Sequence, residues 1–155
     1  MFKEMRRKDK AKPREDAERI FRDFPNGMLA LTLDDGYPYC IPVTQVYENG
    51  NIYFHSAIAG QKYEALIKEP KVCFTVTEKD DLQPGKFTTL YSSALAFGKA
   101  SLVKEESETA RICDLIVKKV DPNHTSEGSE YMKASMGKFC VFKITVEHMT
   151  AKGLG

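Results

Sequence analysis

YFHSAIAGQK, residues 53–62, is the stretch in which a strand pattern gives way to a helix pattern. Side chains alternate between the two faces of a strand. Tyr53 and His55 therefore share one face, and Phe54 and Ser56 share the other. This alternation predicts that His55 and Ser56 do not both face the core, so they serve opposite sides of the strand.

The turn after this strand contains residue types that suit a phosphate group. Backbone N–H groups at the start of a helix are unpaired and carry the positive end of the helix dipole. Gly60 lets the backbone approach a ligand closely, Ser56 can donate a hydroxyl hydrogen bond, and Lys62 supplies a compact positive charge. The P-loop and G-x-G-x-x-G motifs are both absent. An ordinary turn with a solvated lysine is the alternative interpretation.

Hydrophobic periodicity predicts the rest of the fold on both sides of this turn. Asp35-Gly36 and Asn49-Gly50 are typical of tight hairpins. Helical spacing is present at residues 15–24, 61–69, 107–120 and, for about one turn, 131–136. Strand patterns are present at residues 28–33, 39–47, 52–56, 72–77, 89–103 and 139–149. Six strands with short helices between them predict an α+β, mainly β fold, a small antiparallel barrel with peripheral helices.

The chain has 155 residues, of which 42% are apolar, and this fits one globular domain. The formal net charge of +1 gives no strong global field toward nucleic acid or an anionic membrane. Residues 1–14 nevertheless carry a local charge of +5, whereas residues 15–155 carry −4. We interpret the first segment as a basic, solvated tail and the second as a single domain. A nucleic-acid-binding arm is the alternative for the tail, although only Phe2 adds an aromatic ring to it.

Membrane and metal signals are both missing from the sequence. No run approaches the roughly 18–20 apolar residues that span a bilayer, and no signal-peptide core is present, so we expect a cytoplasmic protein without a membrane partner. Cys40, Cys73, Cys113 and Cys140 lack C-x-x-C spacing and lack histidines at zinc-ligand spacing. We therefore expect buried, reduced thiols and no metal site.

Histidines and hydroxyl groups elsewhere leave several interpretations open. No Ser-His-Asp or Cys-His constellation can be assembled around His55 from local sequence, so it is either a hydrogen-bonded structural residue or a functional one. The hydroxyl groups of Tyr91 and Ser93 either reach a ligand or satisfy the backbone. His124 lies in a polar loop and His148 near the end of the last strand, where neither residue indicates a role.

Motifs along nearly the whole chain occur in a characteristic order. They are MRRKD at residues 5–9, DGYPY at 35–39 with IPV at 41–43, YFHSA at 53–57 with G-x-K at 60–62, EPKVCF at 69–74, Y-x-S at 91–93 with FGKA at 97–100, and ITVEHMT at 144–150. This order resembles that of the FMN-binding, pyridoxamine 5′-phosphate oxidase-like proteins. Within them, the sequence is most similar to the 5-nitroimidazole reductase (nitroimidazole-resistance) branch.

The resemblance implies that residues 15–155 form a six-stranded split β-barrel, which pairs as a homodimer with two FMN molecules at the subunit interface. The implied cofactor-binding residues are Ile41, Pro42, Val43 and Thr44 beside the isoalloxazine ring, His55, Ser56 and Ala57 beside the ribityl chain and ring, Gln61 and Lys62 at the phosphate, and Tyr91 and Ser93 on the long strand. His55 is also implied as the catalytic residue on the substrate side.

This chain departs from the family pattern at three positions. Family members often have arginines where Leu90 and Ser92 stand, and an Asn or Asp where Thr44 stands.

The first hypothesis for the function is an FMN-dependent oxidoreductase that takes electrons from NAD(P)H and reduces small acceptors such as nitroaromatic compounds. The alternative is a non-catalytic flavin- or haem-binding module, with His124 or His148 as possible haem ligands.

Overall fold

A computed structural model describes all 155 residues of the protein. Its helices are η1 (Lys8–Lys10, a 3-10 helix), α1 (Arg14–Asp23), α2 (Gln61–Lys68), α3 (Glu106–Val120) and α4 (Thr125–Ala134). Its strands are β1 (Ala11–Lys12), β2 (Asn26–Thr32), β3 (Pro38–Thr44), β4 (Val46–Glu48), β5 (Asn51–Ala57), β6 (Lys71–Gln83), β7 (Thr88–Leu102) and β8 (Phe139–Leu154). The predicted α+β, mainly β class is confirmed, with eight strands in place of six.

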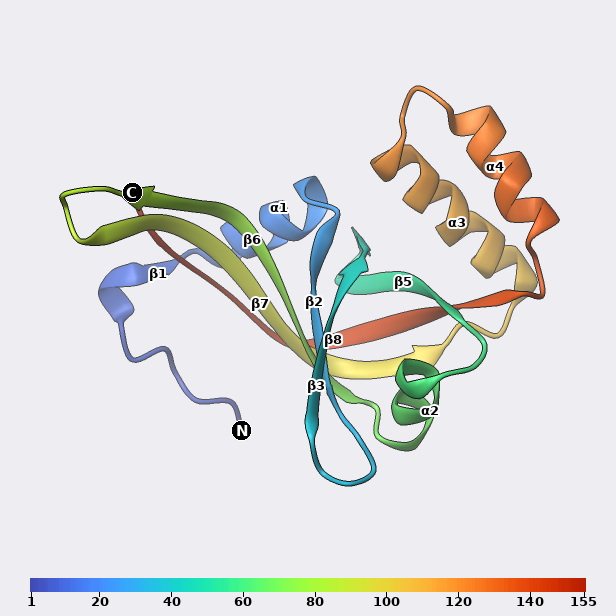
Figure 1. The fold of residues 1–155 in the computed structure, drawn as a ribbon, viewed down its shortest axis with the longest axis horizontal. Coiled ribbons are helices and arrows are strands. Elements are labelled where there is room, and N and C mark those ends of the chain that lie inside the picture. Colours follow the sequence, from blue (N-terminus) through green and yellow to red (C-terminus); the bar gives the residue numbers. More distant parts are fainter.

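All the strands belong to one antiparallel sheet, in the order β3-β2-β6-β7-β8-β5-β4, and β1 pairs with β8. The sheet curls, so that β3 comes back close to β5 (Figure 1). The hairpin of β6 and β7 extends away from the rest of the molecule, opposite α2. β8 pairs with β7 over much of its length, and its first half also pairs with β5. β8 therefore connects the hairpin end of the molecule to the α2 end.

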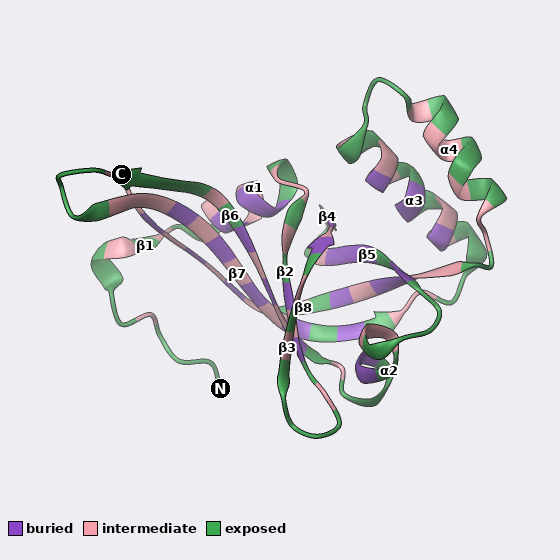
Figure 2. Cartoon of the chain, in the orientation of Figure 1, coloured by how far each residue is buried: buried purple, intermediate pink, exposed green.

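The main core lies inside the curled sheet, where the buried residues of the strands gather (Figure 2). Its largest side chains are four fully buried phenylalanines, Phe21, Phe54, Phe74 and Phe142. The ring centroids of Phe54 and Phe142 are 5.5 Å apart, and those of Phe21 and Phe74 are 6.0 Å apart. Burying one such side chain stabilises the fold by about 1.5–3 kcal/mol. Phe21 belongs to α1, so this packing fixes α1 against the sheet.

A smaller core forms on the outer face of β5, under α3. Tyr53 and Val141 are buried there against three residues of α3, namely Ile112, Cys113 and Ile116. The predicted alternation along β5 is confirmed, because Phe54 and Ser56 face the main core while Tyr53 and His55 face outward. α3 covers this outer face at Tyr53 and leaves it open at His55.

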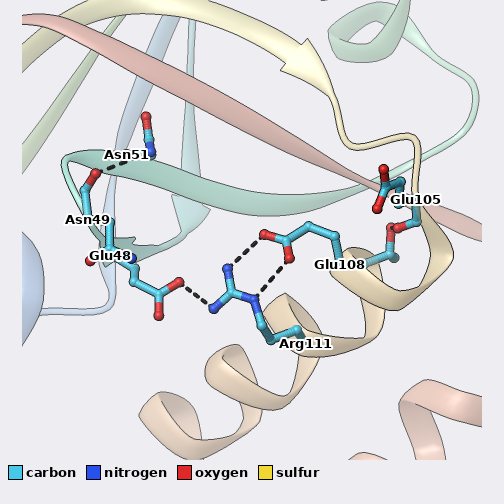
Figure 3. Close-up of polar contacts among 7 residues, drawn as sticks. Glu48, Asn49, Asn51, Glu105, Glu108 and Arg111 are labelled. Atoms are coloured by element: carbon cyan, nitrogen blue, oxygen red, sulfur yellow. Dashed lines mark hydrogen bonds and ion pairs between the residues drawn. The ribbon is translucent and has the colours of Figure 1, made fainter.

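Arg111 joins α3 to the β4–β5 hairpin (Figure 3). Its Nη1 lies 2.5 Å from Glu48 Oε2, and its Nε and Nη2 donate to the carboxylate of Glu108 at 2.9 and 2.7 Å. The Arg111 side chain is 44% exposed, so we expect each ion pair to add less than about 1 kcal/mol to stability. The contact orients α3 over β5 more than it stabilises the chain.

Most predicted elements are confirmed to within a few residues, but the predicted strand 39–47 is interrupted at Gln45. The buried Gln45 side chain donates from Nε2 to the carbonyl oxygens of Phe21 and Phe24 at 2.9 and 2.8 Å. These bonds tie the end of α1 to the sheet and separate β3 from β4. Another strand, β6, continues to Gln83, beyond the predicted end at residue 77.

The helix predicted over 131–136 instead begins at Thr125, as α4. Gly128 lies in the first half of this helix, although glycine is a common helix breaker. Here Gly128 lies against Val117 of α3, and a Cβ at this position would be 2.5 Å from Val117 Cγ1. Glycine thus allows close packing between α3 and α4.

The basic segment 1–14 is only partly the solvated tail that was predicted. Most of its side chains are exposed, but it contains η1 and β1, and Ala11 pairs with Lys152 of β8. Phe2 also contacts the body of the protein, because its ring stacks on His148. The segment is therefore anchored at two points.

All four cysteines are free, as predicted, but only Cys113 is fully buried. Cys73 and Cys140 are half-buried, and Cys40 is exposed on β3, the strand at one end of the sheet.

None of the helices has the length and apolar character needed to cross a bilayer. No group of three or more His, Cys, Asp or Glu side chains is placed to bind a metal ion.

Gly98 lies at the irregularity between β7 and β8, where the two backbones approach closely. A Cβ at Gly98 would lie 2.3 Å from the carbonyl oxygen of Thr145 and 2.8 Å from Ile144 Cγ2. We expect Gly98→Ala to lower the free energy of unfolding by about 1–3 kcal/mol, because the strands must move apart. Chemical denaturation measures this change, with Lys99→Ala on the exposed face as control. An unchanged midpoint for Gly98→Ala would contradict the close approach.

Candidate functional site

The predicted phosphate corner is formed by the end of β5, the turn at residues 58–60 and the first turn of α2. Gly60 has a φ of 99°, a conformation that favours glycine, and no side chain caps the start of α2. The first backbone N–H groups of α2 therefore keep their hydrogen-bonding capacity for a ligand. No atom lies within 4 Å of the place where a Gly60 Cβ would stand, so the backbone is open on this side.

Lys62 provides the positive charge of this corner. It is half-buried and forms no ion pair with an acidic side chain, and burial lowers its pKa. A half-buried ammonium group without a partner is unfavourable, so an anion bound beside it would stabilise the charged form. The open helix start and the unpaired lysine together fit the phosphate group of a nucleotide cofactor.

Ser56 is only 3% exposed and faces the inner side of β5. Its hydroxyl group donates to the carbonyl oxygen of Ala57 at 2.9 Å, and the Sγ of Cys140 lies 3.9 Å from the same oxygen. The hydroxyl donor that the sequence assigned to a phosphate is thus already used within the chain. In this geometry Ser56 holds the end of β5 in place.

His55 lies on the opposite, outer face of β5, at the rim of the corner. The ring of Phe139 meets its imidazole nearly edge-on, with centroids 6.2 Å apart and planes at 87°. Partial burial of the ring lowers the pKa of His55, and the charge of Lys62 lowers it further. Both effects favour the neutral form of His55, in which one nitrogen donates a hydrogen bond and the other accepts.

Removing the charge of Lys62 should raise the pKa of His55. In Lys62→Met the imidazolium form of His55 no longer meets a neighbouring cation, so protonation becomes easier. NMR titration of the imidazole protons measures this shift, with the other two histidines as internal references. Lys68→Met, at the far end of α2, is the matched control. Identical His55 titrations in both variants would contradict the proximity of Lys62.

β3 supplies the residues that were predicted to face the cofactor ring. Val43 is buried, Ile41 and Thr44 are half-buried, and Pro42 is exposed. The hydroxyl group of Thr44 donates to Asn26 Oδ1 at 2.8 Å. β3 pairs only with β2, so the main-chain groups on its other edge are unpaired and lie on the side of the sheet that curls toward β5. The backbone of β3 is thus more accessible to a ligand than most of its side chains.

Tyr91 and Ser93 do not lie at this corner of the same chain. Ser93 pairs with Lys152 of β8, whereas His55 pairs with Val141 of the same strand. Eleven residues separate these two partners, a distance of about 36 Å along the strand. Tyr91 lies still farther out, opposite Leu154, with the Nζ of Lys152 5.8 Å from its ring centroid. One chain therefore holds two separate groups of the predicted residues.

Two cavities flank the corner, and neither was predicted. One, of about 210 Å³, has an acidic lining of Asp34, Asp35 and Glu64 together with Leu33, Gln61 and Ala65. Gln61 thus faces carboxylates, which disfavour a phosphate, and the side of the corner at Lys62 suits an anion better.

The other cavity, of about 400 Å³, is lined by Val103, Glu106, Thr109, Met136, Gly137, Phe139 and Cys140. Phe139 lines it and also meets the ring of His55, and Cys140 is the cross-strand partner of Ser56. Sequence reasoning missed these two residues because only the pairing of β5 with β8, which are far apart in the chain, brings them to the corner. The alternating pattern of residues 139–149 was a signal for the strand but not for its register.

Comparisons with known proteins agree with this fold. A family model described as pyridoxamine 5′-phosphate oxidase matches residues 13–153. A candidate 5-nitroimidazole antibiotic resistance protein from Bacteroides thetaiotaomicron is 24% identical, with a TM-score of 0.76 over 91% of this chain and 84% of that one.

Two further structures are similar in fold. A flavocytochrome from Azotobacter vinelandii is 20% identical, with a TM-score of 0.80 over 98% of this chain and 72% of that one. An FAD-binding protein from Mesorhizobium loti is 20% identical, with a TM-score of 0.65 over 94% of this chain and 97% of that one. Among proteins with curated functions, none matches the sequence.

Proposed function

Because this chain belongs to the pyridoxamine 5′-phosphate oxidase family, we propose that it is an FMN-binding oxidoreductase that takes electrons from NAD(P)H and reduces small acceptors such as nitroaromatic compounds. The observation that carries the proposal is the half-buried, unpaired Lys62 beside the open N-terminus of α2. A phosphate group bound there satisfies the free N–H groups and the ammonium charge at the same time.

The neutral imidazole of His55 suits the proposed chemistry. The bound flavin supplies the electron chemistry, and the protein supplies binding, orientation and polarity. His55 lies beside Lys62 on the open face of β5, where its neutral ring can donate a hydrogen bond to an acceptor or accept a proton. We assign His55 to the acceptor side of the flavin and the main-chain edge of β3 to the ring.

The proposed working unit is a homodimer with FMN at the interface. The separation of Tyr91 and Ser93 from Lys62 along β8 supports it, because both groups can face one flavin only if they come from different subunits. Symmetric pairing of two chains then creates two equivalent sites, each with a phosphate side from one subunit and a β7 side from the other.

The absorption spectrum of the purified protein, followed by NAD(P)H-dependent reduction of a 5-nitroimidazole, tests this function. We expect a yellow protein with about one FMN per chain and turnover that depends on the flavin. A protein that binds FMN but transfers no electrons to nitro compounds or quinones would contradict the enzymatic part. A protein that binds no flavin would contradict the whole proposal.

A haem-binding module is the second candidate, supported by the similarity in fold to a flavocytochrome. Two structural observations weigh against it. The His124 side chain is 64% exposed, so the protein does not enclose a group bound to it, and the ring of His148 is stacked under Phe2. A Soret band in place of a flavin spectrum would favour this candidate.

A further inference from the structure

Phe2, Phe97 and His148 form an aromatic stack on the outer face of β7 and β8. The ring centroid of Phe2 lies 4.8 Å from that of His148, with planes at 5°, and 5.2 Å from that of Phe97, with planes at 25°. Phe97 and His148 are cross-strand partners, and their own rings are 6.4 Å apart at 25°. The two strands thus present a nearly flat aromatic platform, and Phe2 lies on it.

Phe2 is held on this platform by few contacts. It is 41% exposed, and residues 1–6 form no hydrogen bond or ion pair with the sheet. Glu4 pairs only with Lys8, at 2.9 Å within the same segment. Stacking of the Phe2 ring is therefore the main contact that places residues 1–6 over the platform, and it can be exchanged for another stacked ring at little cost.

A cavity of about 320 Å³ lies beside the stack, lined by Met1, Phe2, Lys71, Phe97, Gly98 and Glu147. Lys71 and Glu147 are exposed and have no ion-pair partner. They offer one hydrogen-bond donor and one acceptor at the edge of the platform. With Phe2 displaced, the cavity and the vacated place together accommodate a ring system larger than a phenyl group.

We propose that the Phe97–His148 platform binds a planar bicyclic aromatic compound with a polar group that reaches Lys71 or Glu147, and that Phe2 occupies the platform in its absence. Aromatic rings favour offset stacking at the separations seen here. Because Phe2 competes with the ligand, the apparent affinity equals the affinity of the open platform multiplied by the fraction of chains in which the platform is open. The platform is separate from the phosphate corner of the same chain, since His148 and Val141, the partner of His55, lie seven residues apart on β8, about 23 Å. It lies nearer to the β7 side of the proposed flavin site, because four residues, about 13 Å, separate Phe97 from Ser93.

Fluorescence titration with 2-naphthol tests this site in the full-length protein, which has no tryptophan to interfere. We expect saturable binding at one site per chain. Phe2→Ala should tighten binding roughly threefold to tenfold by removing the competitor, whereas Phe97→Ala and His148→Ala should weaken it by a similar factor. Phe87→Ala is the matched control, because Phe87 is fully exposed at the hairpin tip and stacks on no ring.

Three results would overturn the proposal. They are the absence of saturable binding, an equal affinity in Phe2→Ala and wild type, and equal competition by the saturated analogue decahydro-2-naphthol, which cannot stack. Titration of 2-naphthol in the presence of saturating FMN shows whether the platform and the proposed flavin site are different sites. Unchanged naphthol affinity supports a distinct platform, whereas displacement of naphthol by FMN in a one-to-one ratio contradicts it. Thermal melting of each variant checks that the fold is intact.

Discussion

Lys62→Ala is expected to weaken FMN binding roughly 10- to 100-fold, which corresponds to about 1.5–3 kcal/mol for a charge-assisted hydrogen bond. Lys62 is the only unpaired, half-buried cation beside the open helix start, so no neighbouring side chain replaces it. The acidic lining around Gln61 adds to the loss, because a phosphate without Lys62 faces mainly carboxylates on that side. Quenching of FMN fluorescence on binding measures the dissociation constant.

Lys68→Ala is the matched control for this experiment. Lys68 lies at the other end of α2 and is exposed in an ion pair with Asp34, so we expect its loss to change FMN affinity little. Repeating both titrations at high salt distinguishes a direct contact from a diffuse field, since salt screens exposed charges more strongly than half-buried ones. Equal affinities of Lys62→Ala and wild type would contradict the phosphate assignment.

The second large effect concerns the two separated groups of residues on β8. We expect Lys62→Ala and the double variant Tyr91→Ala/Ser93→Ala each to bind FMN weakly when pure. When the two proteins are mixed, unfolded and refolded together, about a quarter of the wild-type sites should recover tight binding. Random pairing makes half of the dimers mixed, and each mixed dimer has one intact site and one site that carries both changes.

Titration of FMN into the refolded mixture counts the recovered sites. Each variant refolded alone is the control and should recover none. A mixture without recovered sites would show that Lys62 and Tyr91 act from the same chain, or that they do not share a site. Size-exclusion chromatography with light scattering, performed on the same samples, measures whether the proteins are dimers.

Local patterns were sufficient to predict most of the strands and helices, including the strand-to-helix junction at residues 53–62. The alternation in YFHSA separated His55 from Ser56 correctly, because a two-residue period determines strand faces without knowledge of the partners. Glycine at the start of α2 was equally informative, since its positive φ is a local requirement.

Long-range pairing determined the features that could not be predicted. Nothing near Ser56 in the sequence indicates that Cys140 is its cross-strand partner, or that Phe139 contacts His55. The sequence also does not show that the hydroxyl group of Ser56 donates to the carbonyl oxygen of Ala57. Without knowledge of this backbone acceptor, the hydroxyl group was assigned to a phosphate. The short strand β1 escaped prediction for a similar reason, because its pairing depends on the far end of the chain.

That two-residue strand has a consequence for solubility. Beyond Thr145, β8 has no partner on its β5 side until Ala151 and Lys152 meet β1. An uncovered strand edge is a template for pairing with other molecules, and proteins commonly block such edges with short strands and lysines. β1 covers the end of this edge with Ala11 and Lys12, inside the most basic part of the chain. The positively charged segment thereby covers part of the free edge of the longest strand, where pairing with another molecule could otherwise begin.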